Sequence, residues 1–133
     1  MCLFCEIAAG RAGAPIVWET ERITAVLDID PVHEGHVLLL PRIHVDSIAD
    51  LGDEYVLEMA ALTRKLIRAY KDLYGAPGYG VMQNGGASCS FGHFHFHVFP
   101  RWPGDGYDWI YPEGKKEVSE EVARKLREAM QGA

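Results

Sequence analysis

Residues 93 to 99 read His-Phe-His-Phe-His-Val-Phe, so three of the six histidines recur at every second position. Successive side chains of a β-strand point to opposite faces, so a strand here would place His93, His95 and His97 on one face. The opposite face would be apolar and would carry Phe94, Phe96 and Val98. We therefore predict a strand that packs one face on a hydrophobic core and presents three imidazoles to a site.

Three imidazoles on one strand do not by themselves make a metal site. Residues two apart in a strand are ~6.6 Å apart, so His93 and His97 would be separated by roughly 13 Å. One tetrahedral ion could bind all three only if the strand were bent. An imidazole can instead act as a nucleophile near neutral pH, and covalent catalysis splits one difficult step into two. We favour a nucleophile, while solvent-facing histidines without a role remain the alternative.

A loop of small residues, Gly85-Gly86-Ala87-Ser88-Cys89-Ser90, leads into the histidine segment. Small residues let backbone N–H groups approach an anion closely, and the two serine hydroxyls add donors. A Gly-Gly pair is more often an ordinary turn. The position of this loop beside three imidazoles favours a phosphate-binding site.

Length and charge narrow the class of protein. A chain of 133 residues that is 48% apolar is long enough to fold as one domain, 1–133, around a hydrophobic core. Thirteen basic against nineteen acidic residues argue against non-specific binding of nucleic acid. No apolar run reaches the ~20 residues of a membrane span and the start has no signal-peptide pattern, so we expect a cytoplasmic protein that does not bind membranes. Three cysteines argue against a disulfide framework.

Periodicity and turn residues predict mixed helices and strands. A helix is expected over about 53–73, where apolar residues recur every three or four positions, and the continuous apolar run within 35–41 predicts a strand buried on both faces. The other predicted elements are a short helix within 1–10, strands over 16–18, 23–27 and 79–84, a helical turn led by Ser47, an irregular segment over 102–114, and a helix beginning near Ser119.

The chain resembles the histidine triad (HIT) family, because its motif of three histidines alternating with apolar residues is matched in full by residues 93–99. Further similarities occur in the same order and cover about residues 2–101, leaving 102–133 as a C-terminal segment and helix. They are Phe4-x-x-Ile7, Asp28-Ile29, the stretch from Gly35 to Arg42 followed by His44, Asn84, and Pro100-Arg101. The resemblance implies an α+β fold with a five-stranded antiparallel sheet, one long helix, one or two short helices, and a homodimer.

The resemblance also implies chemistry on nucleotides. Members of the family attack the α-phosphorus of a nucleotide and transfer or hydrolyse the nucleotidyl group. We expect a hydrolase of nucleoside phosphoramidates or related conjugates of a purine mononucleotide, acting through a covalent nucleotidyl-histidine intermediate. The alternatives are a dinucleoside polyphosphate hydrolase, a nucleotide-binding regulatory module with incidental turnover, and a metal-dependent hydrolase that uses the histidines as ligands.

By resemblance, His95 is the nucleophile, His97 holds a non-bridging phosphate oxygen, and His93 completes the catalytic triad. Asp28 corresponds to the carboxylate that binds the ribose hydroxyls. The remaining nucleotide-binding residues implied by the resemblance are Phe4, Ile7, Val26, Leu27 and Ile29 at the base, Asn84 at the sugar or phosphate, and Ser88, Cys89 and Ser90 at the phosphate. Burial in a core explains the apolar residues equally well, and Asn84 is also an ordinary turn former.

One residue departs from the family pattern. Cys89 stands where many members have glutamine, four residues before the first histidine of the triad. This replacement bears on how the leaving group is oriented. Cys89 is expected to be a small loop residue, although a thiol beside imidazoles could be reactive.

The pair Cys2-x-x-Cys5 gains partners through the resemblance. Several bacterial-type members bind zinc with such a pair, a loop histidine and the first histidine of the triad, which correspond to Cys2, Cys5, His44 and His93. A closed Cys₂His₂ site of this kind is structural and activates no water. A buried turn of a short helix is the other explanation of the cysteine pair. We assign no role to His33, expected in an exposed turn, or to His36, expected to pack or hydrogen-bond within its strand.

Overall fold

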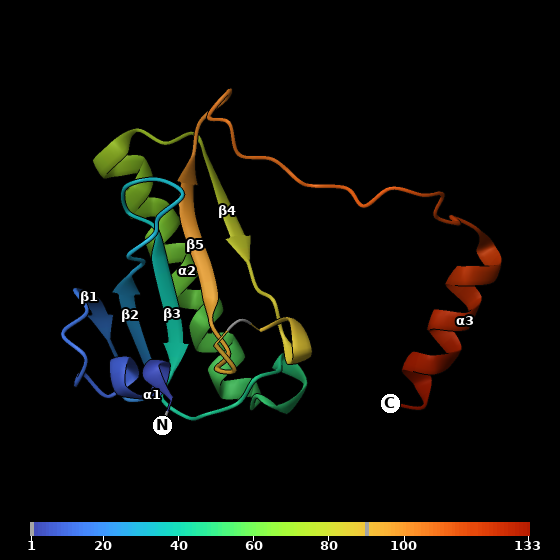
Figure 1. The fold of residues 1–133 in the computed structure, drawn as a ribbon, viewed down its shortest axis with the longest axis horizontal. Helices are drawn as coiled ribbons and strands as arrows, with labels where there is room; N and C mark the ends of the chain where they lie inside the picture. Colours follow the sequence, from blue (N-terminus) through green and yellow to red (C-terminus); the bar gives the residue numbers. More distant parts are fainter. Residues whose placement is uncertain (1, 90) are drawn as a thin grey trace.

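The computed structural model describes residues 2–89 and 91–133. Five antiparallel strands form one sheet in the order β1-β2-β3-β5-β4 (Figure 1). The strands are β1 (Ile16–Glu19), β2 (Ile23–Leu27), β3 (Val37–Pro41), β4 (Gly78–Met82) and β5 (Phe96–Arg101). The helices are α1 (Leu3–Ala8), α2 (Asp53–Tyr74) and α3 (Glu120–Gln131), with short 3₁₀ turns η1 (Ile48–Asp50) and η2 (Gly86–Ser88). The predicted α+β fold with a five-stranded antiparallel sheet is confirmed.

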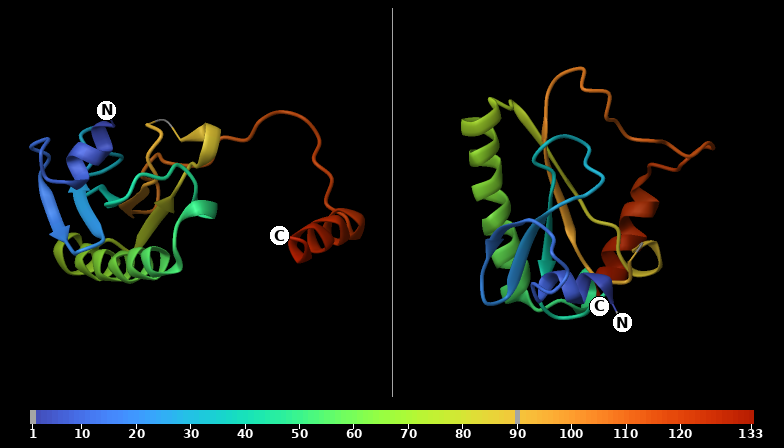
Figure 2. Two further views of the ribbon diagram at one scale, coloured as in Figure 1. Left: turned by 90° about the horizontal axis from the view of Figure 1, so that it is seen from below. Right: turned by 60° about the vertical axis from the view of Figure 1, so that its left-hand side comes forward.

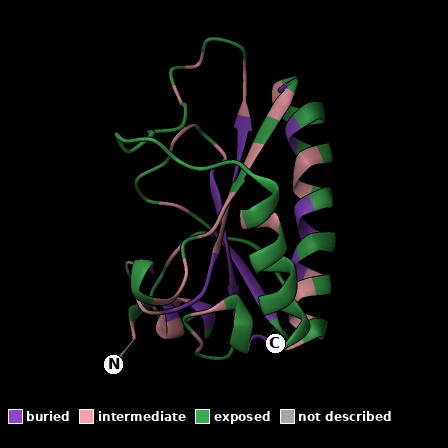
Figure 3. Ribbon diagram, turned by 90° about the vertical axis from the view of Figure 1, so that its right-hand side faces the viewer, coloured by how far each residue is buried: buried purple, intermediate pink, exposed green. Residues whose placement is uncertain are grey.

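The two faces of the sheet are covered differently. Helix α2 lies along one face, and α1 lies on the other with the loop that follows β4 (Figure 2). Because apolar residues recur at helical spacing, α2 turns a buried side to the sheet and an exposed side to solvent (Figure 3). The main core joins α2 to the sheet, and a smaller core that includes Phe4 and Ala8 lies under α1.

Strand register sorts the side chains into rows across the sheet. One row on the α2 face consists of Trp18, Ala25, Leu39 and Phe96. The next row, on the opposite face, consists of Ile16, Val26, Leu38, His97 and Met82. All five residues of β3 are buried, as its continuous apolar run predicted. The alternation therefore places apolar residues of β5 in the main core and directs His97 to the face of α1.

The strand predicted over 93–99 is wrong at its start, because β5 begins only at Phe96. Pairing of β3 with β5 ends at Leu39 opposite Phe96, so the next positions of β3 would be Leu40 and Pro41. Proline has no backbone N–H and cannot continue the ladder. The N–H of Phe94 bonds the carbonyl of Val45 instead. The first two histidines of the motif therefore lie on an irregular segment just before the strand.

A polar cluster fastens the chain after β5. The carboxylate of Asp105 accepts hydrogen bonds from Nε and NH2 of Arg101 at 2.6 and 2.8 Å. His33 Nε2 lies 2.9 Å from the same carboxylate, and its side chain is only 22% exposed, so the exposure predicted for His33 is wrong. The Arg101 guanidinium holds the pKa of Asp105 far below its usual range.

The C-terminal helix α3 stands apart from the rest of the fold. An extended segment leads away from β5, and α3 lies to one side of the sheet without packing on it (Figure 1). Ser119 caps its first turn by accepting the N–H of Val122, as predicted from the sequence. No helix in the described ranges is both long and apolar enough to cross a membrane.

Candidate active site

One hydrogen bond of His95 determines which of its ring nitrogens keeps an unprotonated lone pair. Its Nδ1 lies 2.8 Å from the carbonyl oxygen of His93. A carbonyl oxygen only accepts, so Nδ1 carries the proton and donates. In the neutral ring the other nitrogen, Nε2, then bears an unprotonated lone pair. The backbone thus fixes the tautomer that a nucleophile at Nε2 requires.

A relay of two imidazoles fixes the tautomer of His97. The backbone N–H of Val32 donates to Nδ1 of His36 at 2.9 Å, so the proton of neutral His36 is on Nε2. That Nε2 lies 2.9 Å from Nδ1 of His97 and donates to it. The proton of His97 is therefore on Nε2, where it can be offered to a bound oxygen.

Asp28 stands beside this relay. Its Oδ2 is 3.4 Å from His36 Nε2 and 3.6 Å from His97 Nδ1. The carboxylate also accepts the backbone N–H of Asp30 at 2.9 Å, which holds its side chain at the end of β2. Asp28, His36 and His97 form a compact group of carboxylate and imidazoles in which each member restrains the next.

Burial keeps the imidazoles of the relay neutral. It lowers the pKa of His97 to about 4, and the neighbouring His95 and His36 act in the same direction. Burial also lowers the pKa of His36, against the opposing effect of Asp28. Near neutral pH both rings are therefore uncharged, which is the state assumed in assigning their protons.

The residues predicted at the nucleotide base occupy different environments. Phe4 and Val26 are buried in the core under α1, and Ile7 packs against it. Leu27 is partly exposed, and Ile29 is 93% exposed. The ring of Phe4 lies edge-on to His95, with ring centroids 4.9 Å apart, and stacks on Phe91 at 4.6 Å. Phe4 and the unpredicted Phe91 thus form an aromatic wall beside His95.

The loop predicted at the phosphate leads from β4 to the histidine segment. Asn84 and Ser88 are exposed there, and Ser90 lies outside the described residues. Cys89 is buried, and its Sγ–H donates to the carbonyl oxygen of His93 at 3.3 Å. The backbone N–H of Gly86 bonds the carbonyl of Asp46, which anchors the loop beside the chain that follows β3.

The four residues predicted to bind zinc converge at one point. Their ligand atoms all lie within 4.8 Å of one another, although the residues come from α1, the loop after β3 and the segment before β5. Nδ1 of His93 is 3.6 Å from Sγ of Cys2 and 3.4 Å from Sγ of Cys5. Nδ1 of His44 is 3.3 Å from Sγ of Cys5.

These residues fit a tetrahedral zinc ion. Ligands ~2.0–2.3 Å from such an ion are about 3.3–3.8 Å from one another. The three distances from the histidine Nδ1 atoms to the cysteine sulfurs, 3.3 to 3.6 Å, lie in this range. Nε2 of His93 lies 2.9 Å from the carbonyl oxygen of Pro41 and donates to it, so the Nδ1 lone pair faces the two sulfurs. His93 is thereby turned toward the two cysteines.

The sequence did not reveal the part played by His36. It was expected only to pack or hydrogen-bond within its strand, but it lies just before β3, is buried, and contacts His97 from across the sheet. The register that pairs Val37 with Val98 brings the two histidines together. A signal was available, because His36 directly precedes an apolar strand that had to pair with the histidine segment.

Comparisons with known proteins show where this sequence and this fold recur. The family model described as HIT domain matches residues 10–104. The chain is 33% identical to the adenosine 5'-monophosphoramidase hnt1 of Schizosaccharomyces pombe, over 95% of this chain and 98% of that protein. A crystal structure of a HIT family protein from Bacillus anthracis is similar with a TM-score of 0.84 and 27% identity, covering 98% of this chain and 95% of the other. A Zn-bound histidine triad family protein from Mycobacterium smegmatis is similar with a TM-score of 0.74 and 33% identity, covering 98% and 94%.

Proposed function

This chain belongs to the HIT domain family, and from that premise we propose that it hydrolyses nucleoside phosphoramidates or related nucleotide conjugates at the α-phosphate. The observation that carries the proposal is the pair of opposite tautomers at adjacent histidines. His95 has a free lone pair at Nε2, and His97 carries its proton at Nε2. A nucleophile and a hydrogen-bond donor are what in-line displacement at phosphorus requires. The name of the Schizosaccharomyces pombe relative supports a phosphoramidate as substrate.

In the proposed first step, the lone pair of His95 Nε2 attacks phosphorus. A bond from Nε2 to phosphorus forms as the bond from phosphorus to the leaving nitrogen breaks, and the leaving amine takes up a proton from solvent. The N–H of His97 donates to a non-bridging oxygen and stabilises the charge that develops there. Water then attacks phosphorus, loses a proton, and frees His95 with release of the mononucleotide.

Other residues would bind the nucleotide without reacting. We propose that Asp28 accepts hydrogen bonds from the ribose hydroxyls and that Ser88, Cys89 and Ser90 surround the phosphate. The base would contact the apolar side chains at the open end of β2, with Asn84 near the sugar or phosphate. The residues proposed at the base are Phe4, Ile7, Val26, Leu27 and Ile29.

We further propose that Cys2, Cys5, His44 and His93 hold a structural zinc ion. The ion would fasten α1 to the segment that carries His95, and a closed set of four protein ligands leaves no position for substrate. Removing zinc should therefore lower the melting temperature while adduct formation at His95 continues in the protein that stays folded. Metal content measured by mass spectrometry before and after chelation tests this, and activity abolished in a still-folded protein would point to metal-dependent hydrolysis instead.

The covalent step can be tested directly. The protein is mixed with adenosine 5'-phosphoramidate, quenched within seconds, and its intact mass is measured. We expect an adduct of one adenylyl group, mapped by peptide sequencing to His95 and absent from His95→Ala. His33→Ala is the matched control, because His33 contacts Asp105 outside the site and its removal should leave the adduct in place.

Substrate comparison separates the remaining candidates. Faster turnover of diadenosine tetraphosphate than of the phosphoramidate would favour a dinucleoside polyphosphate hydrolase. Tight binding of a mononucleotide, without turnover of either compound, would indicate a binding module. An adduct that survives His95→Ala would refute the proposed nucleophile.

We also propose a homodimer. Strand β4 forms one edge of the sheet and exposes Tyr79 and Val81. Beyond β5, the chain exposes Trp109 and Ile110, and α3 exposes Leu126. Exposed apolar residues on a sheet edge and on a detached helix are typical of surfaces covered by another chain.

A further inference from the structure

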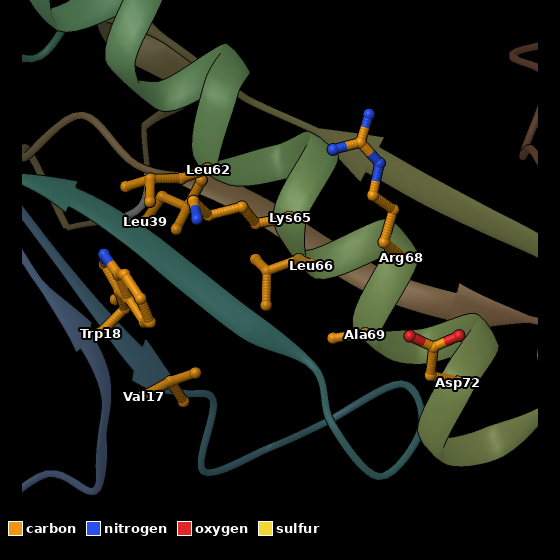
Figure 4. Close-up of a pocket in the computed structure, with 10 residues that line it drawn as sticks. Val17, Trp18, Leu39, Leu62, Lys65, Leu66, Arg68, Ala69 and Asp72 are labelled. Atoms are coloured by element: carbon orange, nitrogen blue, oxygen red, sulfur yellow. The ribbon is translucent and has the colours of Figure 1, made fainter.

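A cavity lies on the α2 face of the sheet, on the opposite side from the histidines. It has a volume of about 450 Å³ and opens between the edge strand β1 and the helix (Figure 4). Its lining is mostly apolar and consists of Val17, Trp18, Ala25, Leu39, Leu62, Leu66 and Ala69, with Lys65, Arg68 and Asp72 on α2. None of these residues belongs to the proposed nucleotide or zinc sites.

Strand register explains why this space exists. Ala25 stands between Trp18 and Leu39 in the same row of the sheet, so a small side chain is flanked by two large ones. On the helix, Ala69 presents another small side chain toward the gap (Figure 4). Small side chains on the sheet and on the helix therefore line a hollow that larger side chains would fill.

Trp18 and Lys65 give the hollow a specific chemistry. Trp18 is 50% exposed, so part of its flat apolar side chain remains open to a ligand. Lys65 extends from α2 toward it, and its Nζ is 5.1 Å from the centre of the ring (Figure 4). Lys65 makes no ion pair with any carboxylate in the part of the chain that the structure describes. Lys65 lies over the Trp18 ring as a cation–π pair but has no carboxylate partner among the described residues, so the site favours a flat ligand that carries a negative charge.

Asp72 determines which end of the cavity an anionic group prefers. It lies seven residues after Lys65 on α2, which is about 10 Å further along the helix axis. The other cation of the lining, Arg68, extends away from Trp18 (Figure 4). A carboxylate at the far end disfavours a second negative charge, so the anionic group of a ligand is directed to Lys65. We propose that this cavity binds a small molecule with a flat apolar body and one anionic group, independently of the nucleotide site.

The test uses 2-naphthoate as probe, with neutral 2-naphthalenemethanol and cationic 2-naphthylmethylamine as matched compounds. Binding is followed by the indole N–H resonance of Trp18 in two-dimensional NMR. We expect saturable binding with the order anion, neutral, cation. Because the nucleotides are proposed to bind the opposite face, saturating AMP should leave the affinity for 2-naphthoate unchanged.

Three variants locate the site. Trp18→Ala removes the aromatic wall, and Ala69→Leu fills the hollow from an exposed position that tolerates a good helix former. Each should weaken 2-naphthoate at least about tenfold, whereas Lys65→Met should weaken it about fivefold, the value of one partly exposed ion pair, and abolish the preference for the anion. Lys71→Met is the control, because Lys71 is on the same helix but outside the cavity, and it should bind as the wild type does.

Two results would overturn the proposal. One is a Trp18 resonance that does not move at millimolar 2-naphthoate. The other is binding that AMP displaces or that Ala69→Leu leaves intact, since either would place the probe elsewhere on the protein. Because Ala69→Leu and Lys65→Met change exposed residues, both variants are expected to fold, and their spectra report this directly.

Discussion

The carbonyl oxygen of His93 accepts two hydrogen bonds, from Nδ1 of His95 at 2.8 Å and from Sγ of Cys89 at 3.3 Å. This one backbone oxygen therefore sets the tautomer of the proposed nucleophile and also accepts the hydrogen bond of the Cys89 thiol. From its resemblance to the HIT family, the sequence left open whether the Cys89 thiol is a second reactive group beside the histidines. Its burial and its donation to a carbonyl favour a role in positioning.

The first residue-scale prediction concerns His36. His36→Phe keeps an aromatic ring beside Phe99 but removes the nitrogen that donates to Nδ1 of His97. We expect His97 to lose its fixed tautomer and orientation, and kcat for adenosine 5'-phosphoramidate to fall about a hundredfold, the loss typical of a misplaced reacting group. Steady-state kinetics should show a much smaller change in KM.

His33→Phe is the control for this substitution, because His33 contacts Trp102 and Asp105 rather than His97. Its kcat should stay close to the wild-type value. A His36→Phe enzyme with kcat within twofold of the wild type would show that the relay to His97 has no part in turnover.

Stability should fall as the pH is lowered below neutrality. The pKa of His97 is about 4 in the folded protein and ~6.5 in an unfolded chain, so the unfolded state binds the extra proton first. The stabilisation is complete above pH ~6.5 and is lost as the pH falls toward the folded pKa. For His97 alone, the loss between pH 7 and pH 5 is about 2 kcal/mol, and the lowered pKa of His36 has the same sign.

Urea unfolding at pH 7 and pH 5, at constant ionic strength, measures this difference. His97→Gln should show a smaller change over the same interval, because the glutamine side chain does not titrate. The lowered pKa of Asp105 acts only below pH ~4, where its usual range lies, so it does not contribute. A free energy of unfolding that is constant or higher at pH 5 would contradict the assignment of neutral, buried imidazoles.

At the scale of secondary structure, the close packing of β4 on β5 depends on one glycine. Gly80 pairs with Phe99, and a Cβ at position 80 would lie 2.5 Å from the Phe99 ring. That ring also packs against His36, with centroids 5.0 Å apart. Because Gly80 has no side chain, there is room for the Phe99 ring, which packs against His36 of the relay.

We predict that Gly80→Ala destabilises the protein by about 1–3 kcal/mol, the usual cost of overpacking a core. Because the Phe99 ring packs against both His36 and Tyr107, its displacement should disturb His36 and lower kcat as well. Gly78→Ala is the matched control in the same strand, since a Cβ there meets Arg101 at an ordinary 3.4 Å. Equal stability of the two variants in thermal unfolding would show that the Phe99 ring can move aside without cost.

Local patterns predicted most of these elements but not where the histidine strand begins. The helical spacing in α2, the apolar run of β3 and the Ser119 cap each depend on neighbouring residues, and all three were confirmed. The start of β5 depends on Pro41, which is distant in sequence and cannot donate to the ladder. A strand ends where its partner can no longer pair, and alternation within one segment carries no information about that partner.

The candidate site likewise contains features that the sequence predicted and one feature that depends on how distant strands pair. Cys2, Cys5, His44 and His93 were grouped by resemblance, and the structure brings their ligand atoms together. The contact between His36 and His97 spans 61 positions and depends on the register of β3 with β5. Sequence patterns do not specify that register. The hydrogen bond from His36 to His97 was therefore not predicted, although both histidines were identified in the sequence.

At the scale of the whole molecule, α3 is an amphipathic helix that packs on no other element among residues 2–89 and 91–133. Val122, Leu126 and Met130 recur every four residues along it, and Leu126 and Met130 are 60% and 74% exposed. Isolated helices of about twelve residues are marginal in water, so their stability comes mainly from packing an apolar face. A second copy of the chain is the partner that the proposed homodimer provides.

We therefore predict a wild-type molar mass near twice 14.8 kDa by size-exclusion chromatography with light scattering at micromolar concentration. Leu126→Asp places a charge in the apolar face of α3 and should shift the mass toward 14.8 kDa and loosen the helix, which hydrogen exchange detects. Lys125→Asp, on the adjacent polar position, alters the net charge by more and should remain dimeric. If the wild type were monomeric while α3 stayed protected from exchange, the helix would need no second copy, and the apolar residues of the C-terminal segment would have to be explained within one chain.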